Sequence, residues 1–204
     1  MPEFFLISYL KELNSLFSKI NTREFSDFIT ELTKAHERLS QIFICGNGGS
    51  AATASHFACD VNKGVSFGKN KRFKVICLSD NIPILLAYAN DVSYEDIFAE
   101  QLKNFLKKGD LVIGVSGSGN SRNILKAIEY ANKNGGKTFG ICGFGGGRLK
   151  GIAQKSLVIN SNDMQKIEDM HMIVFHCVMQ WFIADFKKET PRIFTGNIEP
   201  ATMA

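Results

Sequence analysis

The feature that most constrains the fold is a series of five short apolar runs, each separated from the next by a segment long enough for a helix. Strands that are apolar throughout are buried on both faces, which is typical of parallel sheets. Helices between parallel strands cover the two faces of the sheet. The pattern therefore predicts an α/β three-layer sandwich around a five-stranded parallel sheet. Its strands are expected at Ile42–Cys45, Phe73–Leu78, Leu111–Val115, Thr138–Cys142 and Leu157–Ile159.

Two amphipathic patterns precede the first run and predict two N-terminal helices, from Phe4 to Phe17 and from Phe25 to Ala35, with Thr22 as a cap between them. A third pattern, from Met164 to Phe186, is apolar over much of its circumference. Such breadth indicates burial on two sides. The second side is either more of the same sheet or another protomer in a helical bundle, which the N-terminal helices could join.

With 204 residues, 45% of them hydrophobic, the chain is long enough for one complete core. We expect a single domain over residues 1–190. Pro191 and Pro200 interrupt any periodic pattern near the end, so residues 191–204 are expected to form an irregular tail.

Charge and cysteine usage exclude several classes of partner. The 24 basic and 20 acidic residues give a net charge of +4 that is dispersed along the chain, which argues against a nucleic-acid partner. No uninterrupted apolar span of membrane length is present, so no membrane partner is expected. The five cysteines lie mostly in apolar runs without a CxxC pair, which favours reduced, buried thiols and a cytoplasmic protein.

Two loops rich in glycine and serine follow the first and third predicted strands. Gly46-Asn47-Gly48-Gly49-Ser50 allows close approach of backbone amides to an anion before a helix begins. Ser116-Gly117-Ser118-Gly119-Asn120-Ser121 adds three hydroxyls at a second helix start. Both loops lie at the carboxyl ends of strands, where open α/β sheets bind ligands. Each loop alone could be only a tight turn.

Neither loop has the features of a nucleotide site. The second loop lacks the Gly-Lys-Ser/Thr of a P-loop, and neither forms a dinucleotide fingerprint with an acidic residue at the end of the next strand. A small phosphate monoester is therefore the better ligand.

Four segments of the chain, in this order, carry a resemblance to a known family: ICGNGGSAATASHFACD, YANDVSYED, GVSGSGNSRNILKAIEYA and IEDMHMIVFH. With them the chain resembles the sedoheptulose 7-phosphate isomerases (phosphoheptose isomerases) of the sugar isomerase (SIS) domain superfamily. The resemblance covers about Ile42 to Phe182, and the serine loop within it is common to the whole superfamily. The combination of glycine loop, His-containing helix and final helix is more specific.

The resemblance implies a homotetramer with active sites at subunit interfaces and a phosphosugar as the partner molecule. The serine loop would hold the phosphate, and the other matching positions would line the sugar pocket. On the residues alone, Asn90-Asp91 would be only a turn. The substrate-binding residues implied are Asn47, Gly48, Gly49, Ser50, Asn90, Asp91, Ser116, Gly117, Ser118, Ser121 and Glu168.

Four residues form a candidate metal and catalytic centre: His56, Asp60, Glu168 and His176. His56 and Asp60 are four apart on a predicted helix and share a face. Two imidazoles and two carboxylates suit a divalent ion, with zinc the first choice. Spacing alone would favour packing with one hydrogen bond. The resemblance supports the metal, because some of these isomerases hold zinc through His, Glu, Gln and His at the matching positions.

Two of these four positions depart from the family pattern. Asp60 replaces the usual catalytic Glu and is shorter by one methylene, roughly 1.5 Å of reach, which matters because a misplacement near 1 Å can cost about a hundredfold in rate. Glu168 replaces the usual Gln. The ligand charge becomes −2 and would neutralise a divalent ion, whereas two close carboxylates without a metal would repel each other.

The function implied is conversion of sedoheptulose 7-phosphate to D-glycero-D-manno-heptose 7-phosphate through an enediol, for heptose-containing bacterial surface glycans. Asp60 or Glu168 would be the base and His176 the acid. His171 is interpreted as a supporting or packing residue, and Lys63 and Lys166 as solvated lysines rather than sugar contacts. Two alternatives stay open: a non-catalytic scaffold that binds the DNA-replication initiator, and an isomerase or sensor for another phosphosugar.

Overall fold

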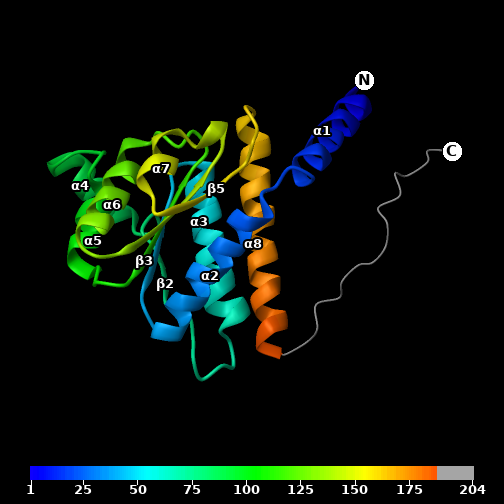
Figure 1. Cartoon of the computed structure of the whole chain (residues 1–204). Helices are drawn as coiled ribbons and strands as arrows, with labels where there is room; N and C mark the ends of the chain where they lie inside the picture. The colour runs from blue at the N-terminus through cyan, green and yellow to red at the C-terminus, as the bar shows by residue number, and fades with distance from the viewer. Residues whose placement is uncertain (188–204) are drawn as a thin grey trace.

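A computed structural model describes residues 1–187. Its centre is a five-stranded sheet in the order β2-β1-β3-β4-β5, with every neighbouring pair parallel (Figure 1). The apolar runs form the strands because a strand covered on both faces buries every side chain. The strands are β1 (Ile42–Cys45), β2 (Val75–Cys77), β3 (Leu111–Ser116), β4 (Lys137–Cys142) and β5 (Lys155–Val158).

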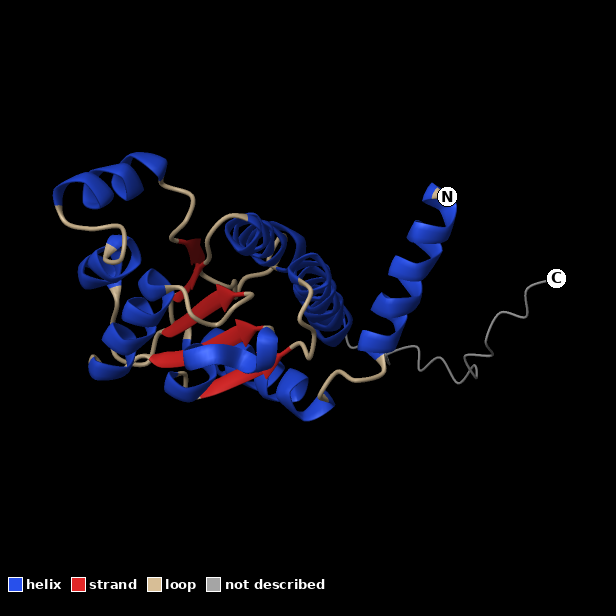
Figure 2. Ribbon diagram, turned by 90° about the horizontal axis from the view of Figure 1, so that it is seen from above, coloured by secondary structure: helices blue, strands red, loops and turns tan. Residues whose placement is uncertain are grey.

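Helices cover both faces of the sheet, so the predicted three-layer α/β sandwich is confirmed (Figure 2). The helices α2, α3 and α8 pack on one face, and α5, α6 and α7 pack on the other. The helices are α1 (Pro2–Phe17), α2 (Thr22–Arg38), α3 (Gly49–Cys59), α4 (Ile82–Asp91), α5 (Ile97–Phe105), α6 (Arg122–Lys133), α7 (Gly147–Ile152) and α8 (Met164–Lys187), with a π-helical turn η1 (Asp60–Val65) and a 3₁₀ turn η2 (Phe144–Gly146).

Aromatic side chains fill the layer between the sheet and the first group of helices. Phe28 of α2 packs on Phe139 of β4 with ring centroids 4.7 Å apart. Phe57 of α3 packs on Phe175 of α8 at 4.5 Å. All four rings are fully buried or nearly so. Because aromatic pairs in a core contribute beyond their buried area, this cluster fixes how α3 crosses α8.

Each predicted strand overlaps an observed one, but β2 is shorter than the predicted Phe73–Leu78, and β5 begins two residues before the predicted Leu157–Ile159. The final helix spans Met164–Lys187 against the predicted Met164 to Phe186. The cap between the first two helices was assigned to the wrong residue. Asn21, not Thr22, is the N-cap of α2, because its Oδ1 accepts hydrogen bonds from the amides of Arg23 (3.0 Å) and Glu24 (3.3 Å). Thr22 is the first residue of the helix.

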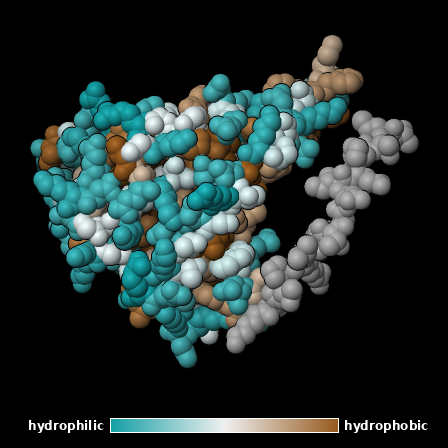
Figure 3. Space-filling view, in the orientation of Figure 1, coloured by the Kyte–Doolittle hydropathy of each residue, from teal (hydrophilic) through white to brown (hydrophobic). Residues whose placement is uncertain are grey.

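The helix α1 projects away from the body of the domain and contacts it at α8 (Figure 1). Two polar contacts attach it: Tyr9 Oη donates to Asp169 Oδ2 at 2.6 Å, and Lys166 Nζ pairs with Glu12 Oε2 at 2.7 Å. Apolar side chains along the projecting part are exposed to solvent (Figure 3). These exposed side chains include Phe4, Phe5, Leu6 and Leu10.

Cys45, Cys77 and Cys142 are buried as expected, whereas Cys59 and Cys177 are exposed. Within residues 1–187, none of the helices is both long enough and apolar enough to cross a membrane. The expected irregular tail, residues 191–204, lies outside the described residues, and the extent of the single domain stays a prediction.

Candidate functional site

The glycine loop connects β1 to α3 and leaves the start of that helix open. Gly48 is the N-cap, with φ of 53°, and has no side chain with which to cap the first amides of α3. Those amides are therefore available to an anion. Gly49 is required for a different reason: a side chain there would collide with the carboxylate of Glu168.

Glu168 thus lies against the first residue of α3, to which α8 brings it across the sequence. The amino end of a helix carries a partial positive charge, so a carboxylate at this point is stabilised.

The serine loop connects β3 to α6 and gathers two hydroxyls. Ser116 Oγ and Ser121 Oγ lie 3.1 Å apart. Ser121 is the N-cap of α6 but makes no capping hydrogen bond, so its hydroxyl and the first amides of the helix face the same space. Ser118 Oγ accepts a hydrogen bond from the Asn120 amide at 3.2 Å. This arrangement suits the oxygens of one phosphate group.

Backbone hydrogen bonds join the serine loop to the segment that includes the connection between β4 and α7. The Gly143 amide donates to the Gly117 carbonyl at 2.8 Å, and the Leu149 amide donates to the Gly119 carbonyl at 2.9 Å. Gly119 has a φ of 65°, and a side chain there would overlap the Gly146 carbonyl. The loop is therefore held in shape by backbone contacts before any ligand binds.

The third feature is a cluster of His56, Asp60 and His176, whose ligand atoms all lie within 4.8 Å of one another. His56 Nε2 is 3.2 Å from Asp60 Oδ2 and 3.0 Å from His176 Nε2. His176 Nε2 is 3.8 Å from the same carboxylate oxygen. Asp60 is the first residue of η1, where α3 widens into a π-helical turn. Such turns often occur at functional sites.

Three of the four predicted metal ligands are thus brought together, and Glu168 is not a member of that group among the described residues. Two nitrogens and one carboxylate oxygen at this spacing suit zinc, which binds such ligands with an open position for substrate or water. The predicted four-residue centre therefore stays a prediction, with a three-residue core in place.

Of the remaining predicted residues, Asn90 and Asp91 lie exposed at the end of α4, where Asn90 Nδ2 donates to Asp91 Oδ1 at 2.7 Å. Ser50 is buried in the first turn of α3. Lys63 is exposed, as interpreted. Lys166 is not a solvated lysine: its side chain is 11% exposed and pairs with Asp163 and Glu12, which raise its pKa.

His171 is 1% exposed, and neither ring nitrogen has a hydrogen-bond partner among the described residues. Burial lowers the pKa of its imidazole to about 4, because a low-dielectric surrounding disfavours the charged form. It is a neutral packing residue beside the Cys142 backbone, in agreement with the interpretation from sequence.

Two residues at the site were missed from the sequence. Asn123, the second residue of α6, exchanges two hydrogen bonds with Asn47, each of 2.9 Å. Tyr94 Oη donates to Asn47 Oδ1 at 3.0 Å. Both follow motifs that were recognised, the serine loop and the Asn-Asp pair, but nothing in their spacing indicates that they meet Asn47.

A parallel sheet with two anion-binding loops at the carboxyl ends of its central strands defines the class of phosphosugar-binding α/β domains. The model of the SIS domain family matches residues 8–143. The phosphoheptose isomerase of Helicobacter pylori strain P12 is 40% identical over 145 residues, which are 71% of this chain and 75% of that protein. A probable phosphoheptose isomerase of Thermoplasma acidophilum is 34% identical over 170 residues, 83% of this chain and 93% of that protein.

The fold is also similar to the solved structure of phosphoheptose isomerase GmhA from Neisseria gonorrhoeae, with a TM-score of 0.82 and 22% identity, over 89% of this chain and 98% of that one. The chain belongs to the SIS domain family and, within it, to the phosphoheptose isomerases.

Proposed function

We propose that the protein interconverts sedoheptulose 7-phosphate and D-glycero-D-manno-heptose 7-phosphate. The observation that carries the proposal is the cluster of His56, Asp60 and His176 on a chain that also has the serine loop. A scaffold that only binds another protein has no need for acid-base groups gathered at one point. The relatives named phosphoheptose isomerase support the same substrate.

The reaction needs one group that accepts a proton from carbon and one that serves the oxygens. A base removes a proton from C1 of the ketose to form the enediol and returns a proton to C2. An acid protonates the oxygen on C2, and the hydroxyl on C1 loses its proton as the aldehyde forms. We assign the acid to His176 and the base to Asp60 or Glu168. The Asp60 carboxylate lies 3.8 Å from His176 Nε2, and the Glu168 carboxylate lies against Gly49 of the glycine loop.

We assign phosphate binding to Ser116, Ser118 and Ser121, supported by their uncapped helix start. The glycine loop, Asn90 and Asp91 would contact the sugar. A pocket of about 270 Å³ beside the glycine loop is lined by Asn47, Gly48 and Tyr94, together with apolar side chains that include Leu85 and Phe98. It is large enough for part of a sugar.

We propose zinc as the metal of His56, Asp60 and His176. A bound zinc ion would polarise the substrate oxygens and lower the barrier to enediol formation. His56 has no other role in the proposed reaction, which makes it the residue that reports on metal binding alone.

We also propose a homotetramer with active sites at the subunit interfaces. Its support is the exposed apolar surface of α1, which a soluble monomer would not leave in water. The five free cysteines support a cytoplasmic location, where a heptose phosphate precursor of surface glycans would be made.

Incubation of the purified protein with sedoheptulose 7-phosphate, followed by NMR, tests the function. We expect a new aldose signal that rises to a constant ratio with the ketose, and the same ratio from the aldose side. Absence of conversion together with conversion of another ketose phosphate would assign a different phosphosugar. Binding without conversion of any would favour a sensor or scaffold.

A further inference from the structure

The carboxamide of Asn47 is held by a closed pair of hydrogen bonds with Asn123. Asn47 Nδ2 donates to Asn123 Oδ1, and Asn123 Nδ2 donates to Asn47 Oδ1, both at 2.9 Å. The Ile124 amide also donates to Asn123 Oδ1, at 2.9 Å. Because the Nδ2 of an asparagine cannot accept a hydrogen bond, this third bond fixes Oδ1 of Asn123 toward the Ile124 amide, and so fixes the orientation of the Asn47 carboxamide.

This pair lies where the two ligand loops meet. Asn47 follows β1, and Asn123 is the second residue of the helix that follows β3, the neighbour of β1 in the sheet. The helix after β1 packs on one face of the sheet and the helix after β3 on the other. Open α/β sheets bind ligands at such a switch point, where the connections from two neighbouring strands lead to opposite faces of the sheet. The amide pair therefore joins the sugar-side loop to the phosphate-side loop.

Asn123 is buried and therefore needs its hydrogen-bond partners within the protein. Asn123 is 2% exposed, and a buried amide without hydrogen-bond partners would destabilise the fold. Asn47 is only half-buried and uses one of its two Nδ2 hydrogens in the described structure. The second hydrogen is left for a ligand oxygen, in a direction that Asn123 determines.

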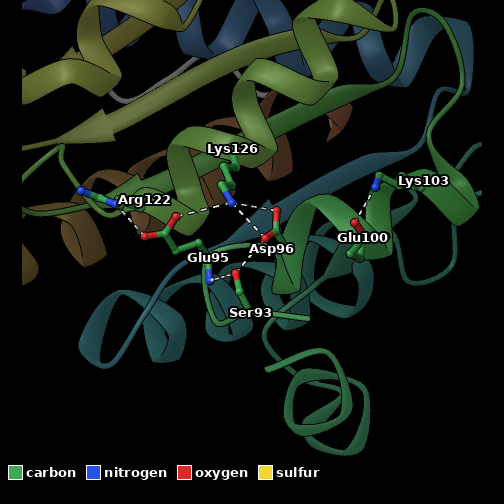
Figure 4. Close-up of polar contacts among 7 residues, drawn as sticks. All are labelled: Ser93, Glu95, Asp96, Glu100, Lys103, Arg122 and Lys126. Atoms are coloured by element: carbon green, nitrogen blue, oxygen red, sulfur yellow. Dashed lines mark hydrogen bonds and ion pairs between the residues drawn. The ribbon is translucent and has the colours of Figure 1, made fainter. Parts of the chain in front are cut away.

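A third segment is joined to the pair through Tyr94. Its hydroxyl donates to Asn47 Oδ1. The loop that carries it is fastened to α6 by ion pairs, as Figure 4 shows: Arg122 Nη1 lies 2.9 Å from Glu95 Oε1, and Lys126 Nζ lies 2.9 Å from Asp96 Oδ2. The amino-terminal part of α6 thus positions both hydrogen-bond partners of Asn47: it carries Asn123, and its ion pairs hold the loop of Tyr94.

We propose that Asn123 is a positioning residue, which orients the Asn47 carboxamide so that its second N–H donates to a hydroxyl or carbonyl oxygen of the sugar. Tyr94 assists by holding the same Asn47 oxygen. The proposal rests on the phosphosugar isomerase function proposed above. It adds that the two loops bind as one unit, because sugar and phosphate contacts are linked through one side-chain pair.

A double-mutant cycle between Asn123→Ala and Asn47→Ala tests this role. Asn123→Ala should lower kcat/KM for sedoheptulose 7-phosphate by about 10- to 100-fold, since a misplaced contact near 1 Å has effects of that size. In the Asn47→Ala background the same change should have little further effect. Asn132→Ala is the matched control: it also removes an asparagine of α6 that is hydrogen-bonded, to the Ile152 carbonyl, but not to Asn47.

Tyr94→Phe provides a second test of the proposal. This variant should fold normally, because Tyr94 is 59% exposed and the ring is retained. We expect a smaller loss, about 3- to 10-fold, which also vanishes in the Asn47→Ala background. Losses that multiply independently in both cycles would overturn the proposal.

Turnover by the unmodified protein distinguishes a failure of the proposed isomerase function from a failure of the proposed role of Asn123. If the unmodified protein does not isomerise sedoheptulose 7-phosphate, the proposed function fails, and the same cycles are then read as affinities for that compound by calorimetry. Coupled losses of affinity would still support the role of Asn123, and independent losses would still overturn it.

Discussion

His56 Nε2 and His176 Nε2 lie 3.0 Å apart, although 120 residues separate them in the sequence. The two rings meet edge to face, with centroids 5.1 Å apart. Both Nε2 atoms therefore face the same point beside the Asp60 carboxylate, which is the arrangement that two metal-binding imidazoles and a carboxylate require.

We therefore predict one zinc ion per chain, lost from variants of the cluster. His176→Gln should lower zinc affinity by at least about tenfold, because it removes a ligand. His36→Gln, which changes a histidine outside the cluster, should retain the metal. Elemental analysis after dialysis against a mild chelator measures the difference. Equal zinc content in both variants, or none in the unmodified protein, would contradict the assignment.

Glu168→Gln should retain zinc to within a few-fold, because the Glu168 carboxylate lies at the start of α3 rather than in the cluster. The same titration measures it. A loss as large as that of His176→Gln would instead show that Glu168 joins the metal, as the four-residue centre requires.

Replacement of Ser116, Ser118 and Ser121 together by alanine should weaken binding of sedoheptulose 7-phosphate by at least about a hundredfold, since each hydrogen bond to a charged group contributes about 1.5–3 kcal/mol. Binding of unphosphorylated sedoheptulose should change little. Calorimetry with both ligands measures the two effects. An equal loss for both sugars would show that the loop does not hold the phosphate.

The buried His171 should make stability depend on pH. Its folded-state pKa of about 4 lies below the usual value near 6.5, so the unfolded chain takes up a proton first as the pH falls. The contribution of this group is complete above about pH 6.5 and decreases toward pH 4, by about 3 kcal/mol in total. Urea unfolding at several pH values should show a smaller decrease for His171→Leu. Identical pH profiles would rule out this source.

The exposed apolar face of α1 should hold the tetramer together. Light scattering should give about four times the chain mass of 22.6 kDa for the unmodified protein. Leu10→Glu should reduce that mass, because Leu10 is 53% exposed and apolar. Lys11→Glu, a neighbouring change of charge on the same helix, is the control. A monomer before any substitution would contradict the assembly and the shared sites.

The layer structure was predictable because it depends on local composition. Uninterrupted apolar runs such as Ile42–Cys45 become strands wherever helices cover both faces, and the loops after β1 and β3 then meet at one edge of the sheet. The pairing of His56 with Asp60 was also predictable, because four residues on a helix are one turn.

Contacts between distant elements were decided by packing alone. The crossing of α3 and α8 brings His176 to His56 but leaves Glu168 at the start of α3, a choice that depends on the angle and depth at which the two helices pack. Likewise the ion pair with Glu12 of α1 helps to hold Lys166 against the domain, where its side chain is only 11% exposed. Sequence determines which side chains a helix presents, and only the tertiary structure determines which atoms they meet, because that depends on how whole elements fit together in space.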